Sequence, residues 1–444
     1  MTNRDGNTQD VRTAGIITGS HGAENIPMSE AAALSMPPAA ALPQRLMSLD
    51  ALRGFDMFWI IGADALVEAL DRMTHADGHA TGGFLGFLAT QLEHADWAGF
   101  HFEDLIFPLF VFMAGISIVF SLGKTIRQEG RAAAVKRICR RGILLFVIGL
   151  FYSGGLTNPW PDMRLMGVLN RIALCYFFAG LIFCFFSLRA MIAISVAALI
   201  GYWALLTFVP IRNIQLEKAT LQELALKRNV PFDPRALFYS TTDRVTGHYE
   251  QGFNLANHID FEYLPGRLYD TYFDPEGLLS TLPAVVTCLL GIFTGLFLLN
   301  RSFNDQQKVV CLLAAGLMLT ALGWAWSAQF PVIKKLWTSS YVLVAGGYSA
   351  ALLGLFYWMV DVCKWQKWCQ PLVWMGMNSI TIYLAANILG GFGKLSRRFA
   401  GGDIHDFLES HLGGSGDLVL ALVGLFLAFW LVHFLYRRKI FLRL

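Results

Sequence analysis

Residues Leu92–Phe120 read LEHADWAGFHFEDLIFPLFVFMAGISIVF. In this stretch a histidine, a tryptophan and several carboxylates come directly before a long apolar run. Such a junction is typical of the point where a chain passes from water into the hydrocarbon of a bilayer. We therefore expect His94, Asp96, Glu103 and Asp104 to lie near the interface, where water reaches them and they can titrate.

The composition indicates a membrane protein. Of the 444 residues, 55% are hydrophobic and 15% are charged, and the mean hydropathy is +0.49, which is too apolar for an ordinary soluble enzyme. The net charge of +3 is small, and Lys and Arg gather in a few loops, which favours membrane orientation over nucleic-acid binding. The seven cysteines follow neither a disulfide framework nor a zinc pattern. We expect an all-α polytopic membrane protein without a nucleic-acid partner or a metal site.

Residues 1–44 differ in composition from the rest of the chain. They are rich in Gly, Ala, Ser, Thr and Pro, and they lead into the tract PPAAALPQR at Pro37–Arg45. We expect a disordered tail, because such a composition buries too little apolar surface to fold. Its acidic residues and prolines also argue against a signal peptide. The tail is expected in the cytoplasm, and residues 45–444 are expected to form the membrane domain.

The apolar segments after the tail predict about ten transmembrane helices, at about 20 residues per crossing. They cover residues 50–70, 104–123, 140–154, 165–187, 190–210, 277–299, 308–328, 337–361, 371–391 and 417–436. Basic residues cluster between the second and third segments and after the last, so both termini are expected in the cytoplasm. The first of these clusters, called the basic cluster below, consists of Lys124, Arg127, Arg131, Lys136, Arg137, Arg140 and Arg141.

The longest hydrophilic segment, residues 211–276, is expected on the opposite, extracytoplasmic side. Its aromatic residues and turn-forming Pro and Gly favour an ordered cap over a linker, with a short helix at Thr220–Lys227. At its end, DPEGLL (Asp274–Leu279) is typical of a helix start. Asp274 and Glu276 would then lie at the positive end of the helix dipole.

The first expected span carries charged residues on one face. At 100° per residue, Asp50, Arg53, Asp56, Asp64 and Glu68 fall within an arc of roughly 120°. Because charge in lipid is costly, this face must point into the bundle or a wet cavity, where it could form a substrate or cofactor pathway. For Asp50 and Arg53, a local ion pair that locks the bundle is the favoured interpretation. Asp64 lies about 21 Å further along the helix and is the better functional candidate.

Two further polar residues inside the spans have two interpretations each. Arg171 could clamp a phosphate or carboxylate, or it could pair with a carboxylate of the first span. Asn378 could contact a ligand, although a hydrogen bond between helices is the default for such a residue. The sequence leaves both pairs of alternatives open.

His94 is the histidine of interest in the opening stretch, but an isolated interfacial histidine is usually just solvated or hydrogen-bonded. Several other histidines are expected on the same side of the membrane: His101, His258, His405 and His411. Spacing alone does not rank these candidates.

Six motifs, in one order, resemble the heparan-alpha-glucosaminide N-acetyltransferase family and its bacterial homologues. They are LMSLDALRGFDMF, LEHADWAGFHFEDLIFPLFVFMAGISI, RLMGVLNRIALCYF, YFDPEGLLSTLPA, LWTSSYVL and WMGMNSITIYL. The similarity runs from about Arg45 to the C-terminus. It implies a multi-pass protein of the bacterial inner membrane that moves acetyl from cytoplasmic acetyl-CoA to the amine of an amino sugar or glycan on the extracytoplasmic side.

The resemblance also implies roles for particular residues. The family's proposed active histidine and the aspartate ten residues after it map onto His94 and Asp104. Asp96 stands where the family's human lysosomal member has serine. The chain is also expected to lack that member's large lumenal domain and first span, so its glycan recognition is expected to differ.

Acyl transfer from a thioester to an amine needs a neutral amine, a group that takes its proton, and donors that hold the developing oxyanion. His94 is the expected general base or, alternatively, a nucleophile that accepts the acetyl group, and Asp104 would orient its ring. The expected substrate-binding residues are Asp64, Asp96, Trp97, Glu103, Asp274 and Glu276. The expected residues for acetyl-CoA, as co-substrate, are Arg53, Arg171 and Asn378.

The expected partners are an amino sugar or glycan acceptor, acetyl-CoA and the lipid bilayer, and a homodimer is also considered. Two other functions remain open. One is a transporter for an amino sugar or oligosaccharide, with the polar first span lining its path; the absence of an evident internal repeat counts weakly against it. The other is a non-catalytic membrane scaffold.

Overall fold

A computed structural model describes residues 46–74, 84–157 and 159–442 of the chain. In these residues nearly all regular structure is helical, and the strands β1 (Ile211–Arg212) and β2 (Arg244–Val245) form one short antiparallel pair. The expectation of an all-α protein is therefore confirmed. The expected disordered tail, residues 1–44, lies outside the described residues.

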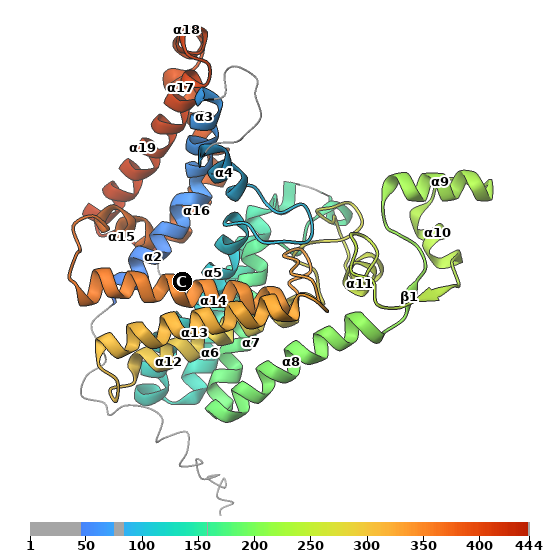
Figure 1. Ribbon diagram of the computed structural model, residues 1–444, viewed down its shortest axis with the longest axis horizontal. Helices are drawn as coiled ribbons and strands as arrows, with labels where there is room; N and C mark the ends of the chain where they lie inside the picture. Colours follow the sequence, from blue (N-terminus) through green and yellow to red (C-terminus); the bar gives the residue numbers. More distant parts are fainter. Residues whose placement is uncertain (1–45, 75–83, 158, 443–444) are drawn as a thin grey trace, which may run out of the picture. The chain divides into compact units, whose positions relative to one another are not determined.

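Helix α5 lies at the centre of the bundle (Figure 1). It contacts α2, α6, α7, α12 and α14. The first half of the bundle contains α2 (Met47–Phe58), α3 (Asp64–Thr74), α4 (Phe84–Gln91), α5 (Glu103–Glu129), α6 (Arg131–Tyr152), α7 (Val168–Phe185) and α8 (Leu188–Phe208). The second half contains α12 (Thr281–Leu299), α13 (Asp305–Trp326), α14 (Ser339–Phe356), α15 (Gln370–Met377), α16 (Ser379–Ile388), α17 (Phe392–Ala400), α18 (Asp403–His411) and α19 (Ser415–Arg437).

Seven helices in the described parts of the chain are long and apolar enough to cross a membrane: α5, α7, α8, α12, α13, α14 with its π-helical extension, and α19. This is the pattern of a multi-pass membrane protein. The remaining three expected spans correspond to the α2–α3 segment, to α6 with its basic first half, and to α15–α16. The expected total of ten crossings and the orientation of the termini stay predictions.

Two of the expected spans are broken helices. A π-helical turn, η1 (Trp59–Ala63), separates α2 from α3, and Gly62 in it has a φ of 123°, which residues with a Cβ rarely adopt. The charged residues of the first span therefore do not share one continuous helical face. Similarly, α15 ends at Met377 and α16 begins at Ser379, and the φ and ψ of Asn378 between them, −119° and 22°, lie outside the α-helical region.

The first halves of these broken helices, α2 and α15, pack closely. A Cβ placed on Gly54 would lie 1.7 Å from the carbonyl oxygen of Leu372. One placed on Gly376 would lie 1.9 Å from the carbonyl oxygen of Asp50. Glycine is needed at both positions because the two backbones touch, which is common where helices pack in membranes.

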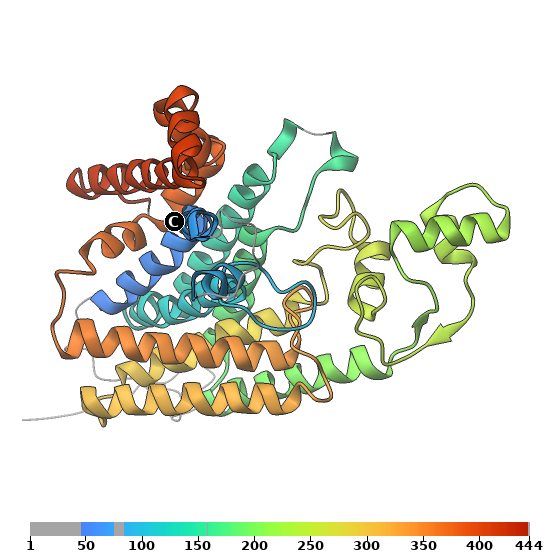
Figure 2. The same cartoon turned by 45° about the horizontal axis from the view of Figure 1, so that its top comes forward.

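Between α8 and α12 the chain forms the segment expected as a cap. It contains α9 (Lys218–Arg228), α10 (Pro234–Ser240), α11 (Leu255–Tyr263) and the two strands, and it follows the end of α8 in both views (Figures 1 and 2). The short helix expected at Thr220–Lys227 is confirmed as α9. Leu221, Phe238 and Phe273 belong to a buried apolar cluster inside this segment, so it has a small core of its own.

The expected helix start at DPEGLL is wrong in position. Helix α12 begins at Thr281, and residues 274–280 form turns before it. Asp274 and Glu276 pair with Arg164 instead of capping the helix. A charge-assisted contact to a fixed guanidinium is stronger than an interaction with a helix dipole, which explains the shift.

Candidate functional site

A cavity of about 330 Å³ opens between the start of α5, the start of α7 and the broken helices. One end of its lining is polar: His94, Glu103, Asp104, Arg164, Tyr269, Glu276, Lys334 and Lys335. The other end is mainly apolar: Met57, Ile60, Ile106, Phe107, Phe110, Val168, Leu169, Ile172, Trp337, Ser379, Ile380 and Tyr383. The lining thus offers polar groups for a reactive centre and an apolar surface for a nonpolar part of the same molecule.

The polar end is built around Asp104, whose side chain is 1% exposed. Its Oδ1 lies 3.3 Å from His94 Nδ1 and 3.4 Å from Lys334 Nζ. The Lys334 ammonium in turn lies 3.1 Å from His94 Nδ1 and 3.4 Å from Nε2. When Nδ1 carries the ring proton, that proton faces Asp104. Nε2, which lies 3.4 Å from the Lys334 ammonium, then carries the lone pair that can accept a proton or an acyl group.

The fold holds Asp104 firmly in place. Its Oδ2 accepts backbone N–H bonds from Ala95 at 3.2 Å and His101 at 3.0 Å, so the carboxylate closes the loop that carries His94. Its own carbonyl accepts the Tyr341 hydroxyl at 2.7 Å. A buried carboxylate with these partners can orient a neighbouring imidazole.

The His94 loop is tied to two neighbouring segments. Trp97 donates its indole N–H to the Tyr249 carbonyl at 2.8 Å and so contacts the cap. Gly99 donates to the Val332 carbonyl at 2.9 Å, which brings the loop beside the segment that carries Lys334. These contacts explain how residues 240 positions apart in sequence meet at His94.

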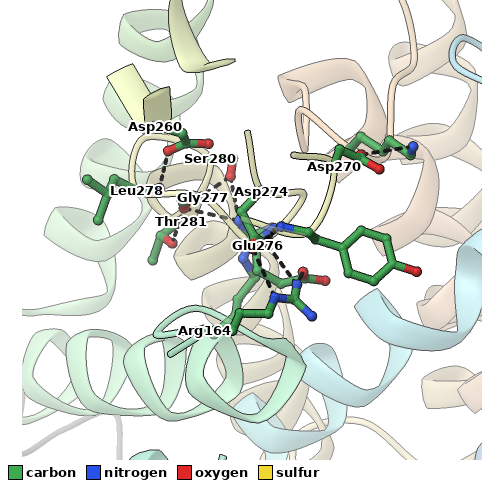
Figure 3. A network of polar contacts seen from close by, with 12 residues as sticks. Arg164, Asp260, Asp270, Asp274, Glu276, Gly277, Leu278, Ser280 and Thr281 are labelled. Carbon is green, nitrogen blue, oxygen red and sulfur yellow. Dashed lines mark hydrogen bonds and ion pairs between the residues drawn. The ribbon is translucent and has the colours of Figure 1, made fainter. Parts of the chain in front are cut away.

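Arg164 also lines the cavity, and it lies in a network of polar contacts with Asp274 and Glu276 (Figure 3). Its Nε and Nη2 donate to the two oxygens of Asp274 at 2.9 and 2.8 Å, and Nη2 also donates to Glu276 at 2.7 Å. Its guanidinium lies 4.7 Å from the centre of the Tyr269 ring. These carboxylates raise the pKa of Arg164 despite its partial burial, whereas burial raises the pKa of Glu276 to about 7. Glu276 can therefore exchange a proton near neutral pH.

Lys334 and Glu103 bring further charge to the polar end. The Lys334 side chain is 20% exposed, and burial lowers its pKa, although Asp104 and Glu103 oppose that shift. One carboxylate oxygen of Glu103 is buried without a hydrogen-bond partner among the described residues. Such an oxygen can accept a bond from a bound molecule.

The structure brings some of the predicted substrate residues together and separates others. His94, Trp97, Glu103, Asp104 and Glu276 line the cavity. The remaining three lie outside its lining: Asp96 is exposed, Asp64 starts α3, and Asp274 lies behind Arg164.

The residues expected to bind acetyl-CoA lie outside the cavity lining. Arg53 bonds to Asp50 at 3.3 Å, as the favoured interpretation has it, and to Ser117 at 2.9 Å. Arg171 is fully buried, donates to the Gly277 carbonyl at 3.2 Å and to the Ser280 hydroxyl, and lies over the Trp337 ring. Its Nε and Nη1 are buried without a hydrogen-bond partner among the described residues, so the clamp interpretation stays a prediction, whereas no described contact pairs Arg171 with the first span.

Asn378 behaves as a structural residue in its described contacts. Its side-chain amide donates to the Trp374 carbonyl at 3.2 Å, while its side-chain oxygen is buried without a hydrogen-bond partner among the described residues. The next residue, Ser379, lines the cavity. The helix break at Asn378 is thus followed directly by the part of α16 that lines the cavity.

The candidate histidines, which spacing could not rank, are separated by the structure. Among them, His94 lines the cavity, whereas His101 contacts the Glu93 carbonyl at 3.0 Å. His258 is buried in the cap, where burial lowers its pKa to about 4. His405 lies with Glu409 and Asp417 in a cluster whose possible ligand atoms all fall within 4.8 Å. Backbone amides and Arg72 already bind the two carboxylates, which accounts for this cluster.

The sequence analysis missed Lys334 and Tyr269 and left Arg164 outside the predicted site. Lys334 comes two residues before the motif LWTSSYVL, and this position is the one feature of the sequence that places it near the family's motifs. A lysine beside a motif is nevertheless ordinary in a loop, and the contact with His94 depends on tertiary structure. Arg164 likewise opens a quoted motif, but its partners lie 110 and 112 positions away.

Comparison with known protein sequences gives independent information on the family. No protein-family model matches the chain. It is 26% identical over 443 residues to the human "Heparan-alpha-glucosaminide N-acetyltransferase", covering 90% of this chain and 60% of the relative. It is also 26% identical over 394 residues to the mouse protein of the same name, covering 79% of this chain and 56% of that relative. Both comparisons support the resemblance to the heparan-alpha-glucosaminide N-acetyltransferase family that the motifs indicate.

Proposed function

We propose that this protein is a membrane acyltransferase that moves an acetyl group from acetyl-CoA to the amine of an amino sugar or glycan. One observation carries the proposal: the His94–Asp104 pair opens onto a cavity that is polar at this end and apolar along α5 and α7. The similarity to named N-acetyltransferases supports the same reaction class.

In the proposed reaction, the amine nitrogen attacks the carbonyl carbon of the thioester. A C–N bond forms, the carbonyl electron pair moves onto oxygen, and His94 takes the proton that the nitrogen releases. The oxyanion then collapses, the C–S bond breaks, and the thiolate receives that proton from His94. Asp104 stabilises the imidazolium that exists between these two proton transfers.

The acceptor would bind at the polar end of the cavity. Glu103 and Glu276 provide carboxylates there, and Trp97 provides an aromatic surface suited to a sugar ring. Asp64 and Asp96 lie outside the cavity lining and would act on the acceptor amine through their negative electrostatic potential. Asp274 would act by holding Arg164 in position.

The thioester arm of the donor would lie along the apolar end. A cavity of about 330 Å³ is at the lower end of the range for ligand sites, roughly 300–1,000 Å³, so it suits an acyl-thioester arm better than the whole of CoA. Arg53, Arg171 and Asn378 would contribute by supporting the helices around this arm, because none of them lines the cavity.

Transfer across the membrane is the further part of the proposal. Lys124, in the basic cluster, lies 20 residues along α5 from Asp104, or about 30 Å at the helical rise, which is close to the thickness of a bilayer core. The cavity follows α5 only to Phe110, about 9 Å from Asp104. Donor entry from the cytoplasm therefore requires an opening beyond this cavity, and the inner bacterial membrane is the proposed location.

A second candidate function is transport of an amino sugar or oligosaccharide. The observation in its favour is that both broken helices, at η1 and α16, contribute to the cavity, because discontinuous helices commonly build substrate sites in carriers. A carrier needs no histidine–aspartate pair at its site, so we favour the acyltransferase.

The test is to incubate purified protein in sealed liposomes with radiolabelled acetyl-CoA and glucosamine. The proposal predicts labelled N-acetylglucosamine that accumulates with time and protein concentration. Uptake of unmodified glucosamine with no acetylated product would support the carrier. The absence of both signals would leave the scaffold interpretation.

A further inference from the structure

Lys334 lines the cavity but has no part in the reaction described above. It lies in the loop between α13 and α14, and its ammonium reaches the cavity beside His94 and Asp104. Lysine is rarely buried in a protein unless it is paired or functional. Its nearest described carboxylate oxygen is Asp104 Oδ1, at 3.4 Å, and that oxygen is shared with His94.

In one tautomer of His94, Lys334 has more N–H donors than described acceptors around it. An ammonium has three N–H donors, whereas the neighbouring polar atoms are Asp104 Oδ1 and the two ring nitrogens of His94. In the tautomer that protonates His94 Nδ1, that nitrogen cannot accept a bond. At least one donor of Lys334 is then available to a molecule in the cavity.

The other cations at the polar end each pair with a carboxylate other than Asp104. Arg164 binds Asp274 and Glu276, and Lys335 Nζ lies 3.1 Å from Asp270 Oδ2. The backbone N–H groups of the His94 loop that face Asp104 donate to that carboxylate. Among the described cavity residues, Lys334 is therefore the cation best placed to meet new negative charge next to His94.

We propose that Lys334 is a catalytic residue that donates a hydrogen bond to the thioester carbonyl oxygen as it becomes an oxyanion. This inference rests on the proposed acyltransferase function and supplies the third requirement of that reaction. The amine nitrogen forms the C–N bond, the carbonyl electron pair moves to oxygen beside the ammonium, and His94 takes the amine proton. When the C–S bond breaks, the electron pair returns to the carbonyl and Lys334 keeps its proton throughout.

Position and charge both suit this role. Because Lys334 lies within 3.4 Å of both ring nitrogens of His94, a carbonyl oxygen can contact the ammonium while the attacking amine contacts the ring. The Lys334 side chain is also mostly buried, at 20% exposed, and hydrogen bonds to a developing charge are stronger there than in bulk water. It is preorganised there by Asp104, so little rearrangement accompanies the reaction.

The experiment compares steady-state acetylation of glucosamine by the wild-type protein, Lys334→Met, Lys334→Gln and Lys334→Arg. Removing one oxyanion donor lowers kcat by about 10²–10³-fold, so we expect that loss in Lys334→Met with KM for acetyl-CoA changed less than threefold. Lys334→Arg, which keeps the positive charge and N–H donors, is expected to recover at least tenfold of the loss. Lys308→Met is the matched control, since Lys308 pairs with Asp305 at the start of α13 and is expected to keep kcat within twofold.

Size-exclusion chromatography and thermal melting report whether each variant is folded. If Lys334→Met does not fold, Lys334→Gln carries the test, and its kcat is expected to fall at least tenfold at unchanged KM. A wild-type kcat in either folded neutral variant, or a change in KM without a change in kcat, would overturn the role of Lys334 and leave the proposed function standing. A wild-type protein that forms no acetylated product would overturn the proposed function, and this inference with it.

Discussion

The replacement of Asp104 by asparagine removes a charge from the site and keeps the shape of the side chain. Asp104 Oδ1 lies 3.3 Å from His94 Nδ1, and for two unit charges at that distance and an effective dielectric constant of 20 the interaction is about 5 kcal/mol. The His94 side chain is 58% exposed, so solvent screening reduces this to about 2–3 kcal/mol. At about 1.4 kcal/mol per factor of ten, kcat should fall about 100-fold.

The assay is transfer of radiolabelled acetyl from acetyl-CoA to glucosamine by protein in liposomes, with kcat and KM measured separately. The loss should appear in kcat, because the stabilised imidazolium exists only after proton transfer has begun. Asp361→Asn is the matched control: Asp361 also accepts a backbone N–H, from Ser48 at 3.1 Å, but lies outside the cavity lining. An Asp104→Asn protein that is folded and keeps the wild-type kcat would refute this view of the pair.

Three further predictions concern stability. Gly376→Ala should lower the free energy of unfolding by about 1–3 kcal/mol, because its Cβ would meet a carbonyl of α2. The control is Gly393→Ala, where a Cβ has open space. Equal melting temperatures of the two variants in detergent would contradict the close contact. Arg164→Lys should lower the free energy of unfolding by about 2 kcal/mol, because lysine cannot reproduce the two parallel bonds of Arg164 to Asp274. An unchanged melting temperature would contradict this prediction. Burial lowers the pKa of His258 from its ordinary value of 6.5 to about 4 in the folded protein. The folded state therefore loses stability relative to the unfolded state as the pH falls from 6.5 toward 4. The loss is on the order of 3 kcal/mol. The protection of cap amides, corrected for the pH dependence of intrinsic exchange, should therefore fall over this interval in the wild type and less in His258→Gln, and equal profiles would contradict the assignment.

Local sequence patterns predict the helical membrane character of this protein well. Long apolar runs have few other structures available, because every backbone polar group in a bilayer must be bonded within the segment. The charged positions at residues 94–104 are also close in sequence, so the loop that places His94 against Asp104 is a local feature. The resemblance to the acetyltransferase family, and not the spacing alone, indicated this pair before the structure was known.

The rest of the site depends on contacts between distant parts of the chain. Lys334 meets His94 across 240 positions, and Arg164 meets Asp274 across 110. Neither partner is marked by spacing, since a lysine in a loop and an arginine before a helix are ordinary residues. The pairing of Arg164 also explains why α12 starts later than its sequence pattern indicates.

The helix breaks are a second limit on prediction from sequence. The run around Gly62 and the run around Asn378 are apolar enough to be continuous spans, and one glycine or asparagine in a helix is commonly tolerated. Tertiary packing decides the outcome here: the close contact of α2 with α15 fixes the first halves, and the second halves turn at η1 and α16. As a result the predicted polar face of the first span is divided.

The most direct test of the central claim is the rate of acetyl transfer to glucosamine by His94→Ala, compared with the wild type and with His411→Ala. His411 lies in α18, and its ring contacts Ser410 and the Phe407 carbonyl, so its removal should leave the rate unchanged. Labelled N-acetylglucosamine should form with the wild type and the control and should be absent with a folded His94→Ala protein. Undiminished acetylation by His94→Ala would contradict this expectation.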